Sequence, residues 1–364
     1  MRALPDNIVL TTLVLCCHVL AAEPSADRPP NVLLVMADDL GAKELGCYGH
    51  SRHRTPNLDR LAAGGVRFET CWATPLCSPS RVEIMTGRYG FHTGWYNFIG
   101  RVAAPTYLGA EIYTFGDLLK SRGYATGLAG KWQLNYIQQQ PRMILDSGFD
   151  AYCVWAWEQL PADAKFEGTP RQRYWHPAVI QDGKHLPTTP EQYGPDVYSG
   201  WVIDFMRKNK DRPFFAYYPA CLTHSPWDPT PAPEHPGQKT EGGFQANLEY
   251  LDHVMGRLIQ ALDDLGLRKN TIVLFTGDNG TGKSGKGTVT ELGVRVPLIA
   301  NCPGRVKSGV VSRELVDFSD FFPTLAEWTG ATIPKDLPID GQSFACILRG
   351  GEKPGRDWIF SYLG

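Results

Sequence analysis

Two apolar segments that lie far apart in the sequence each end in a pair of polar residues. The first leads into Asp38 and Asp39, and the second leads into Asp278 and Asn279. Short, continuously apolar segments bounded by Gly or Asp are typical of buried parallel strands. In open α/β sheets, ligands bind beyond the carboxyl ends of such strands. We therefore expect a doubly wound sheet that brings both polar pairs to one edge. The two segments are residues 31–36 and 271–275.

The two polar pairs would supply three carboxylates and one amide oxygen to a single site. Oxygen ligands of this kind suit Ca²⁺ or Mg²⁺, whereas Zn²⁺ prefers nitrogen and sulfur in a tetrahedral arrangement. Either pair alone would most simply be a polar turn after a strand. Because the pattern occurs twice, we predict a metal site formed by Asp38, Asp39, Asp278 and Asn279. Ca²⁺ is the first choice for this site and Mg²⁺ the alternative.

A helix-opening motif, Cys77-Ser78-Pro79-Ser80-Arg81, lies between the two strands in the sequence. Ser78 is a typical N-cap residue, and Pro79 is a typical first residue of a helix. This reading places residue 77 at the positive end of a helix dipole. Anionic groups are stabilised at such a position, so the motif predicts a helix N-terminus that can bind an anion.

Six blocks of the sequence carry recognisable motifs. They are residues 77–81 with 85–88, 123–126 with 130–132, 213–215 with 223–226, 276–280, 285–287, and 291 with 295–297. These blocks, in this order, resemble signatures of the type I sulfatases of the alkaline phosphatase superfamily, and the resemblance covers nearly the whole chain after residue 28. It implies an α/β fold with a large mixed, mainly parallel sheet flanked by helices, followed by a small C-terminal α+β subdomain.

The resemblance implies that Cys77 is oxidised after translation to formylglycine, with a formylglycine-generating maturation enzyme as partner. One hydroxyl of the hydrated aldehyde would attack sulfur and expel the substrate alcohol. The second hydroxyl would then release sulfate as the aldehyde re-forms. The modified residue would join Asp38, Asp39, Asp278 and Asn279 as a metal ligand. The implied enzyme is a sulfatase, a sulfuric ester hydrolase, with a sulfated carbohydrate as the favoured substrate.

The resemblance also assigns roles to five further residues. Arg81 would brace the modified residue, while Lys131 and Lys286 would contact it and neutralise charge on the sulfate oxygens. His224 would donate a hydrogen bond to the sulfate or protonate the leaving oxygen. Gln133 departs from the family, which usually has His at this position. Because Gln forms hydrogen bonds but cannot titrate, any acid–base role of this position is lost or moved.

Two other functions stay open at the level of sequence. Relatives with the same Cys-x-Pro-x-Arg signature hydrolyse phosphonate or phosphate esters, which share the tetrahedral geometry of sulfate. A non-catalytic protein that binds sulfated glycans is the other alternative. Gln133 and the short C-terminus favour it, whereas the intact Cys77 and Arg81 argue against it. Nucleic acid is not indicated as a partner, because the net charge is -2 and no basic stripe is present.

The two ends of the chain suggest the domain organisation. Residues 1–22 are expected to be a secretory signal peptide rather than an uncleaved anchor, because their apolar stretch is short and ends in Ala21 and Ala22. The mature protein would be exported, periplasmic or secreted, without stable membrane insertion. Residues 23–335 would form the catalytic domain. Residues 336–364 would be the truncated start of the C-terminal subdomain, with 358–363 as a strand.

Local patterns predict helices over residues 56–64, 115–123 and 245–265. Two segments without periodicity, 91–105 and 156–195, are expected to form loops around the site. The second carries Trp157, Tyr174 and Trp175, whose rings could stack on a sugar. Besides Cys77, the six cysteines of the mature chain could form disulfides or remain small buried thiols.

Overall fold

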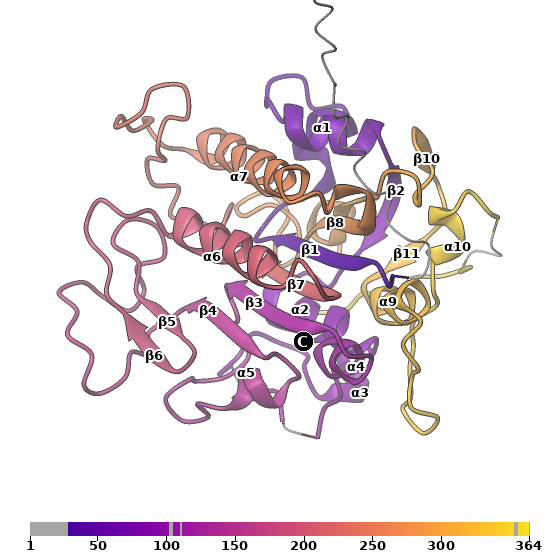
Figure 1. The fold of residues 1–364 in the computed structure, drawn as a ribbon, viewed down its shortest axis with the longest axis horizontal. Coiled ribbons are helices and arrows are strands. Elements are labelled where there is room, and N and C mark those ends of the chain that lie inside the picture. The colour runs from indigo at the N-terminus through magenta and orange to yellow at the C-terminus, as the bar shows by residue number, and fades with distance from the viewer. Residues whose placement is uncertain (1–27, 102–104, 110, 353–355, 364) are drawn as a thin grey trace, which may run out of the picture.

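The sheet predicted from the sequence is present and large. The computed structural model describes residues 28–101, 105–109, 111–352 and 356–363. Their eleven strands form one sheet in the order β10-β2-β9-β8-β1-β7-β3-β4-β5-β6, with β11 paired to β2 (Figure 1). Neighbours from β8 through β1, β7 and β3 to β4 are parallel. Strand β9 is antiparallel to β8 and β2, and β5 is antiparallel to β4 and β6. The expected mixed, mainly parallel sheet is therefore confirmed. The strands are β1 (Asn31–Ala37), β2 (Val66–Trp72), β3 (Ala125–Gly130), β4 (Ala151–Trp155), β5 (Val179–Gln181), β6 (Lys184–Leu186), β7 (Phe214–Pro219), β8 (Thr271–Gly277), β9 (Arg295–Asn301), β10 (Val310–Ser312) and β11 (Val316–Asp317).

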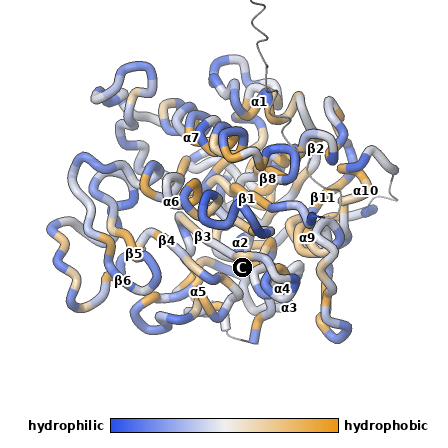
Figure 2. Tube along the Cα trace, in the orientation of Figure 1, coloured by the Kyte–Doolittle hydropathy of each residue, from blue (hydrophilic) through white to orange (hydrophobic). Residues whose placement is uncertain are grey.

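Helices cover both faces of the sheet. Helices α6 and α7 lie in front of the central strands in Figure 1, and α1 packs beside α7. Helices α2, α4 and α9 pack against the opposite face. Figure 2 shows hydrophobic and hydrophilic residues alternating along α7, as expected for a helix with one buried side. The helices are α1 (Pro56–Ala63), α2 (Cys77–Thr86), α3 (Gly90–Thr93), α4 (Phe115–Ser121), α5 (Met143–Asp146), α6 (Gly194–Lys208), α7 (Phe244–Asp264), α8 (Glu291–Val294), α9 (Phe321–Thr329) and α10 (Ala345–Leu348), with short 3₁₀ helices at Ala42–Glu44, Gly46–Tyr48, Arg268–Asn270 and Phe318–Asp320.

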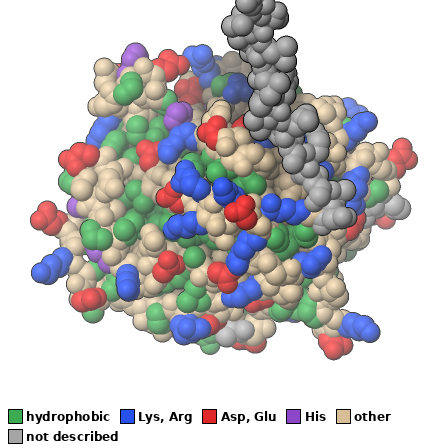
Figure 3. All heavy atoms as spheres, viewed as in Figure 1, with side chains coloured by type: hydrophobic (Ala, Val, Ile, Leu, Met, Phe, Trp, Pro, Cys, Tyr) green, Lys and Arg blue, Asp and Glu red, His purple; other side chains and the backbone are tan. Residues whose placement is uncertain are grey.

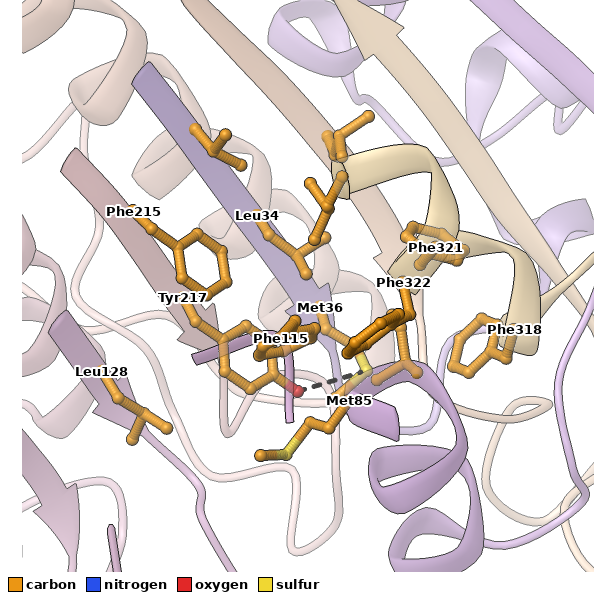
Figure 4. Close-up of a cluster of buried hydrophobic side chains, with 14 of the residues drawn as sticks. Leu34, Met36, Met85, Phe115, Leu128, Phe215, Tyr217, Phe318, Phe321 and Phe322 are labelled. Carbon is orange, nitrogen blue, oxygen red and sulfur yellow. Dashed lines mark hydrogen bonds between the residues drawn. The ribbon is translucent and has the colours of Figure 1, made fainter. Parts of the chain in front are cut away.

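The hydrophobic core has two halves, one on each face of the sheet. Side chains of β1 alternate between them, because successive residues of a strand point to opposite faces. Leu33 and Val35 pack with residues of α6 and α7, whereas Leu34 and Met36 pack with residues of α2 and α9. Figure 4 shows this second half, with Met85 of α2 below the strand. Strand β1, which leads into Asp38 and Asp39, and helix α2, which carries Cys77 and Arg81, are thus held by continuous packing.

Most local predictions agree with the structure, but two are wrong. The segment 156–195, expected to form a loop, contains the short antiparallel strands β5 and β6. The three predicted helices correspond to α1, α4 and α7, with ends that differ by a few residues. The strand expected at 358–363 is absent, since residues 356–363 form no strand. This segment is held through side chains: Arg356 pairs with Asp320, and the Tyr362 hydroxyl donates to the carbonyl oxygen of Trp95 (3.1 Å). The expected signal peptide lies outside the described residues.

The seven cysteines among the described residues are all free thiols. Cys71, Cys153, Cys221 and Cys302 are fully buried and belong to the two halves of the core. These four cysteines therefore act as small apolar side chains, and no described cysteine forms a disulfide.

Charge of both signs is mixed over the face that carries α6 and α7. Figure 3 shows Lys and Arg side chains interspersed with Asp and Glu there, in keeping with the net charge of -2. Across the described residues, every helix is too short or too polar to cross a membrane.

Candidate active site

The two polar pairs meet at one edge of the sheet. Strands β1 and β8 are parallel neighbours, with Ala37 opposite Gly277, so the residues that follow them emerge side by side. The backbone N–H of Asp39 donates to Asp278 Oδ1 (2.9 Å), and Asn279 Nδ2 donates to Asp39 Oδ1 (2.9 Å). All four residues of the two pairs are at most 3% exposed. The structure thus brings together the four residues that the sequence selected as metal ligands.

The oxygen atoms of this cluster fit a hard divalent cation. Asp38 Oδ1 and Asn279 Oδ1 are buried, and neither has a hydrogen-bond partner within the described residues. One ligand atom from each of Asp38, Asp39 and His224 lies within 4.8 Å of the other two. A buried polar atom without a partner costs about 1–3 kcal/mol, and a bound cation would remove that cost. Carboxylate and amide oxygens are the ligands that Ca²⁺ takes in proteins.

Two lysines neutralise the first acidic pair. Lys131 Nζ donates to Asp38 Oδ2 (2.7 Å), and Lys286 Nζ donates to Asp39 Oδ1 (2.6 Å). Lys131 follows Gly130, whose φ of 111° lies in the left-handed region that favours glycine. A Cβ atom at Gly130 would lie 2.1 Å from a carbonyl oxygen of β7. Gly130 therefore lets the chain turn beside β7 and direct Lys131 into the site.

Arg81 connects the helix α2 to the second acidic pair. Its guanidinium donates to the Lys131 carbonyl oxygen (2.6 Å) and to Asp278 Oδ2 (2.8 Å). Burial and the neighbouring Asp38 raise the pKa of Asp278 to about 6, although Arg81 and Lys131 oppose that rise. Burial would also raise the pKa of Asp38, but cationic neighbours led by Lys131 hold it well below its usual range. The two carboxyls therefore differ in how strongly they hold a proton.

Cys77 lies at the start of helix α2, which corrects the expected capping pattern. The helix begins at Cys77 rather than at Pro79, because the carbonyl oxygen of Leu76 already accepts from the N–H of Ser80 (3.2 Å). Ser78 does not cap the helix; its Oγ accepts from the backbone N–H of a residue in the following loop. Cys77 is 1% exposed and still occupies the positive end of a ten-residue helix.

Gln133 contacts the candidate nucleophile directly. The thiol of Cys77 donates to Gln133 Oε1 at 3.5 Å. Gln133 has a φ of 55° and Asp39 a φ of 58°, both in the left-handed region that non-glycine residues rarely adopt. Such a conformation costs about 1 kcal/mol and persists where the surrounding structure fixes it, as at many functional sites. Gln133 is therefore held against residue 77 by the backbone as well as by its hydrogen bond.

Replacement of Gln133 by alanine should lower kcat about tenfold, because one hydrogen bond to the reacting residue is lost while the charges of the site remain. Steady-state kinetics with an aryl sulfate would measure the effect, and Gln260→Ala on the exposed side of α7 is the matched control. An unchanged kcat in the Gln133 variant would show that this contact has no part in turnover.

His224 is positioned by the segment that follows β7. The backbone N–H of Thr223 donates to the Asp38 carbonyl oxygen (2.7 Å), which fixes the segment beside β1. The buried hydroxyl of Tyr174 donates to the carbonyl oxygens of Cys221 and His224. Tyr174 is 2% exposed, in keeping with this role. Because the ring is buried, the expectation that it stacks on a sugar is wrong.

The imidazole of His224 faces the acidic pair. Its Nδ1 lies 2.5 Å from the Ser225 carbonyl oxygen, and its Nε2 lies 3.8 Å from Asp39 Oδ2. Burial lowers the pKa of His224 to about 4, and Lys131 and Arg173 add to the lowering while nearby aspartates oppose it. Nε2 is thus the ring nitrogen that faces the centre of the site.

Sequence reasoning missed two basic residues at the edge of the site. Arg173 lies close enough to His224 to influence its pKa, and Lys283 belongs to the same loop as Lys286. Neither residue falls in one of the matched blocks. The sequence offers one signal for Arg173: it directly precedes Tyr174, one of the aromatic residues of the segment expected to lie around the site.

Comparisons with known proteins agree with the geometry of the site. The sequence model of the family described as Sulfatase matches residues 30–331. Arylsulfatase A of Homo sapiens is 35% identical over 378 residues, which covers 94% of this chain and 72% of that protein. N-acetylgalactosamine-6-sulfatase of Canis lupus familiaris is 33% identical over 377 residues, which covers 93% of this chain and 69% of that protein.

Several solved structures share the fold of this chain over most of its length. Ps i-CgsB in complex with k-i-k-neocarrahexaose has a TM-score of 0.76 at 26% identity and covers 89% of this chain and 77% of its own. The PsFucS1 sulfatase from Pseudoalteromonas sp. has a TM-score of 0.74 at 25% identity, covering 90% and 74%. The phosphonate monoester hydrolase of Agrobacterium radiobacter shares the fold, with a TM-score of 0.66 at 21% identity, covering 90% and 79%. With its family match and its relatives above 30% identity, the chain belongs to the sulfatase family, whose members hydrolyse sulfate esters.

Proposed function

We propose that this sulfatase cleaves sulfate esters of carbohydrates through a formylglycine made from Cys77. The observation that carries the proposal is the position of Cys77 at the start of a buried helix, in contact with Gln133, on the helix whose Arg81 is bonded to Asp278 of the acidic cluster. The helix dipole and the surrounding cations favour an anion at this point. A maturation enzyme that oxidises the thiol is the partner that this proposal requires.

Asp38, Asp39, Asp278 and Asn279 would hold Ca²⁺ together with modified residue 77. Their oxygen atoms, two of them buried without a hydrogen-bond partner among the described residues, support this assignment. When bound, the ion would polarise the nucleophilic oxygen and stabilise negative charge. Mg²⁺ is the alternative, because it takes the same type of ligand and differs in the size and rigidity of the site that it needs.

The remaining site residues would act on the sulfate group. Lys131 and Lys286 would neutralise charge that develops on its oxygens as the leaving group departs. Arg81, committed to Asp278 and to the Lys131 backbone, would position those two groups rather than contact the substrate. His224 would direct Nε2 to the sulfate or to the leaving oxygen, where it could donate a hydrogen bond or a proton.

A carbohydrate substrate is supported by the kinds of protein that this chain resembles. One relative is an N-acetylgalactosamine-6-sulfatase, and one structural neighbour was solved with k-i-k-neocarrahexaose. We further propose that the protein is exported to the periplasm or secreted, with residues 23–335 as catalytic domain and 336–364 as part of a C-terminal subdomain. The apolar N-terminal stretch followed by two alanines supports export.

Matched aryl sulfate, phosphate monoester and phosphonate ester substrates would test the reaction class. Protein produced together with a formylglycine-generating enzyme should hydrolyse the sulfate ester with a kcat/KM about tenfold or more above that for either phosphoryl ester. Initial rates at equal leaving-group pKa give the comparison. A preference for a phosphoryl ester would reject the proposal and favour a phosphonate or phosphate ester hydrolase.

A further inference from the structure

Three cations near His224 each rest on the ring of a tryptophan. The Arg173 guanidinium lies 4.3 Å from the ring centroid of Trp155, and Lys239 Nζ lies 3.5 Å from that of Trp175. Lys283 Nζ lies 4.5 Å from the ring centroid of a third tryptophan, Trp227. Cation–π contacts occur about once per 70–80 residues in proteins. Three of them around one short segment are therefore more than this frequency predicts.

The segment in question, residues 221–231, carries His224. Trp227 Nε1 donates to the Thr223 carbonyl oxygen (2.9 Å), one residue before His224. Trp175 Nε1 donates to the Pro229 carbonyl oxygen (2.7 Å). Arg173 immediately precedes Tyr174, whose hydroxyl donates to the His224 carbonyl oxygen. Trp227 and Trp175, two of the three tryptophans in contact with the cations, are therefore hydrogen-bonded to the backbone of this segment.

Lys283 is also connected to the metal site through the chain. A Cβ atom on the preceding residue, Gly282, would lie 3.1 Å from Asp39 Oδ2. Lys283 itself has a φ of 66°, in the left-handed region, and its side chain is exposed. The backbone thus turns sharply beside the acidic cluster and directs this lysine outward, over Trp227.

None of the three cations forms an ion pair with a carboxylate within the described residues. The cations of the site differ in this respect, because Arg81, Lys131 and Lys286 are all paired. A cation on an aromatic face keeps its N–H donors free for an anion in solution.

We propose that Arg173, Lys239 and Lys283 form a binding site for a second anionic group, so that the preferred substrate carries a sulfate or carboxylate besides the scissile sulfate ester. This inference rests on the proposed function. Arg173 precedes Tyr174, whose hydroxyl donates to the His224 carbonyl oxygen, and Lys283 lies three residues before Lys286. The side chains of His224 and Lys286 are 24% and 22% exposed. Lys239 lies over Trp175, which donates to the Pro229 carbonyl oxygen of the same segment. The substrate class is then a multiply charged glycan rather than a neutral sugar with one sulfate.

Two sugar sulfates that differ only in a second sulfate would test the inference. Wild-type enzyme should show a higher kcat/KM for the disulfated sugar, mainly through KM, since the second anion does not react. Lys283→Met should reduce kcat/KM for the disulfated sugar about fivefold more than for the monosulfated one. Lys283→Arg should restore the preference, and Lys335→Met, an exposed lysine after α9, should not affect it. The preference should also decrease as salt is added.

Calorimetric binding to the Cys77→Ala protein separates this inference from the proposed reaction. Tighter binding of the disulfated sugar, weakened in a Cys77→Ala, Lys283→Met double variant, would support the second site even without turnover. Equal affinity for both sugars, or an equal loss for both in the Lys283 variant, would overturn it. If the wild-type enzyme turned over neither sugar while the Cys77→Ala protein still bound the disulfated sugar more tightly, the proposed reaction would be rejected instead.

Discussion

Replacement of Cys77 by alanine should lower sulfate ester hydrolysis by about 10⁴-fold or more, the scale seen when a covalent nucleophile is removed from an enzyme. The side chain is buried at the start of α2, where its thiol donates to Gln133 Oε1. Because alanine removes only the sulfur atom and suits a helix, the variant should stay folded and lose no more stability than the removal of one buried thiol costs. Sulfate release by the purified variant measures the effect.

The matched control is Cys153→Ala, which removes another buried thiol, from β4. This variant should lose some stability through a small cavity and keep its activity. Mass spectrometry of the peptide that contains residue 77 should find an aldehyde in active wild-type protein. Full activity in protein whose residue 77 is entirely thiol would disprove the formylglycine mechanism.

The centre of the site was predictable because its signals are local. A short apolar run followed by Asp38 and Asp39, and a second followed by Asp278 and Asn279, describe two strand ends directly. Parallel neighbours in a sheet then bring such ends together, as β1 and β8 do. The helix that carries Cys77 was also predicted correctly, but its start was not. The helix begins at Cys77 rather than at Pro79, because the Leu76 carbonyl oxygen accepts the first helical hydrogen bond.

The edge of the site was not predictable, because its contacts join segments with no shared pattern. Arg173 on Trp155 and Lys283 on Trp227 are pairs that only the folded loops create. The strand expected at 358–363 failed for a related reason. An apolar, aromatic sequence favours a strand, but pairing needs a free strand edge beside it. Tertiary contacts such as that of Arg356 with Asp320 hold this segment instead.

Asp278→Asn should abolish calcium binding and activity together and should also destabilise the fold. One oxygen of Asp278 accepts from Arg81 (2.8 Å) and the other from the backbone N–H of Asp39 (2.9 Å). The neutral amide would leave the guanidinium of Arg81, 1% exposed, without its closest carboxylate. Removal of one partner from a buried ion pair costs about 3–5 kcal/mol. Calorimetric calcium titration and thermal unfolding would measure the two effects.

Asp252→Asn separates loss of the metal from loss of a buried carboxylate. Asp252 is 2% exposed and accepts from the backbone N–H groups of Asn57 and Leu58 at the start of α1. This variant should lose stability but still gain melting temperature when Ca²⁺ is added, because a ligand that binds only the folded state stabilises it. Asp278→Asn should gain none. If Asp278→Asn bound Ca²⁺ as tightly as the wild type, the ion would have to lie elsewhere. The oxygens of Asp38 and Asn279, which lack hydrogen-bond partners among the described residues, would then need another explanation.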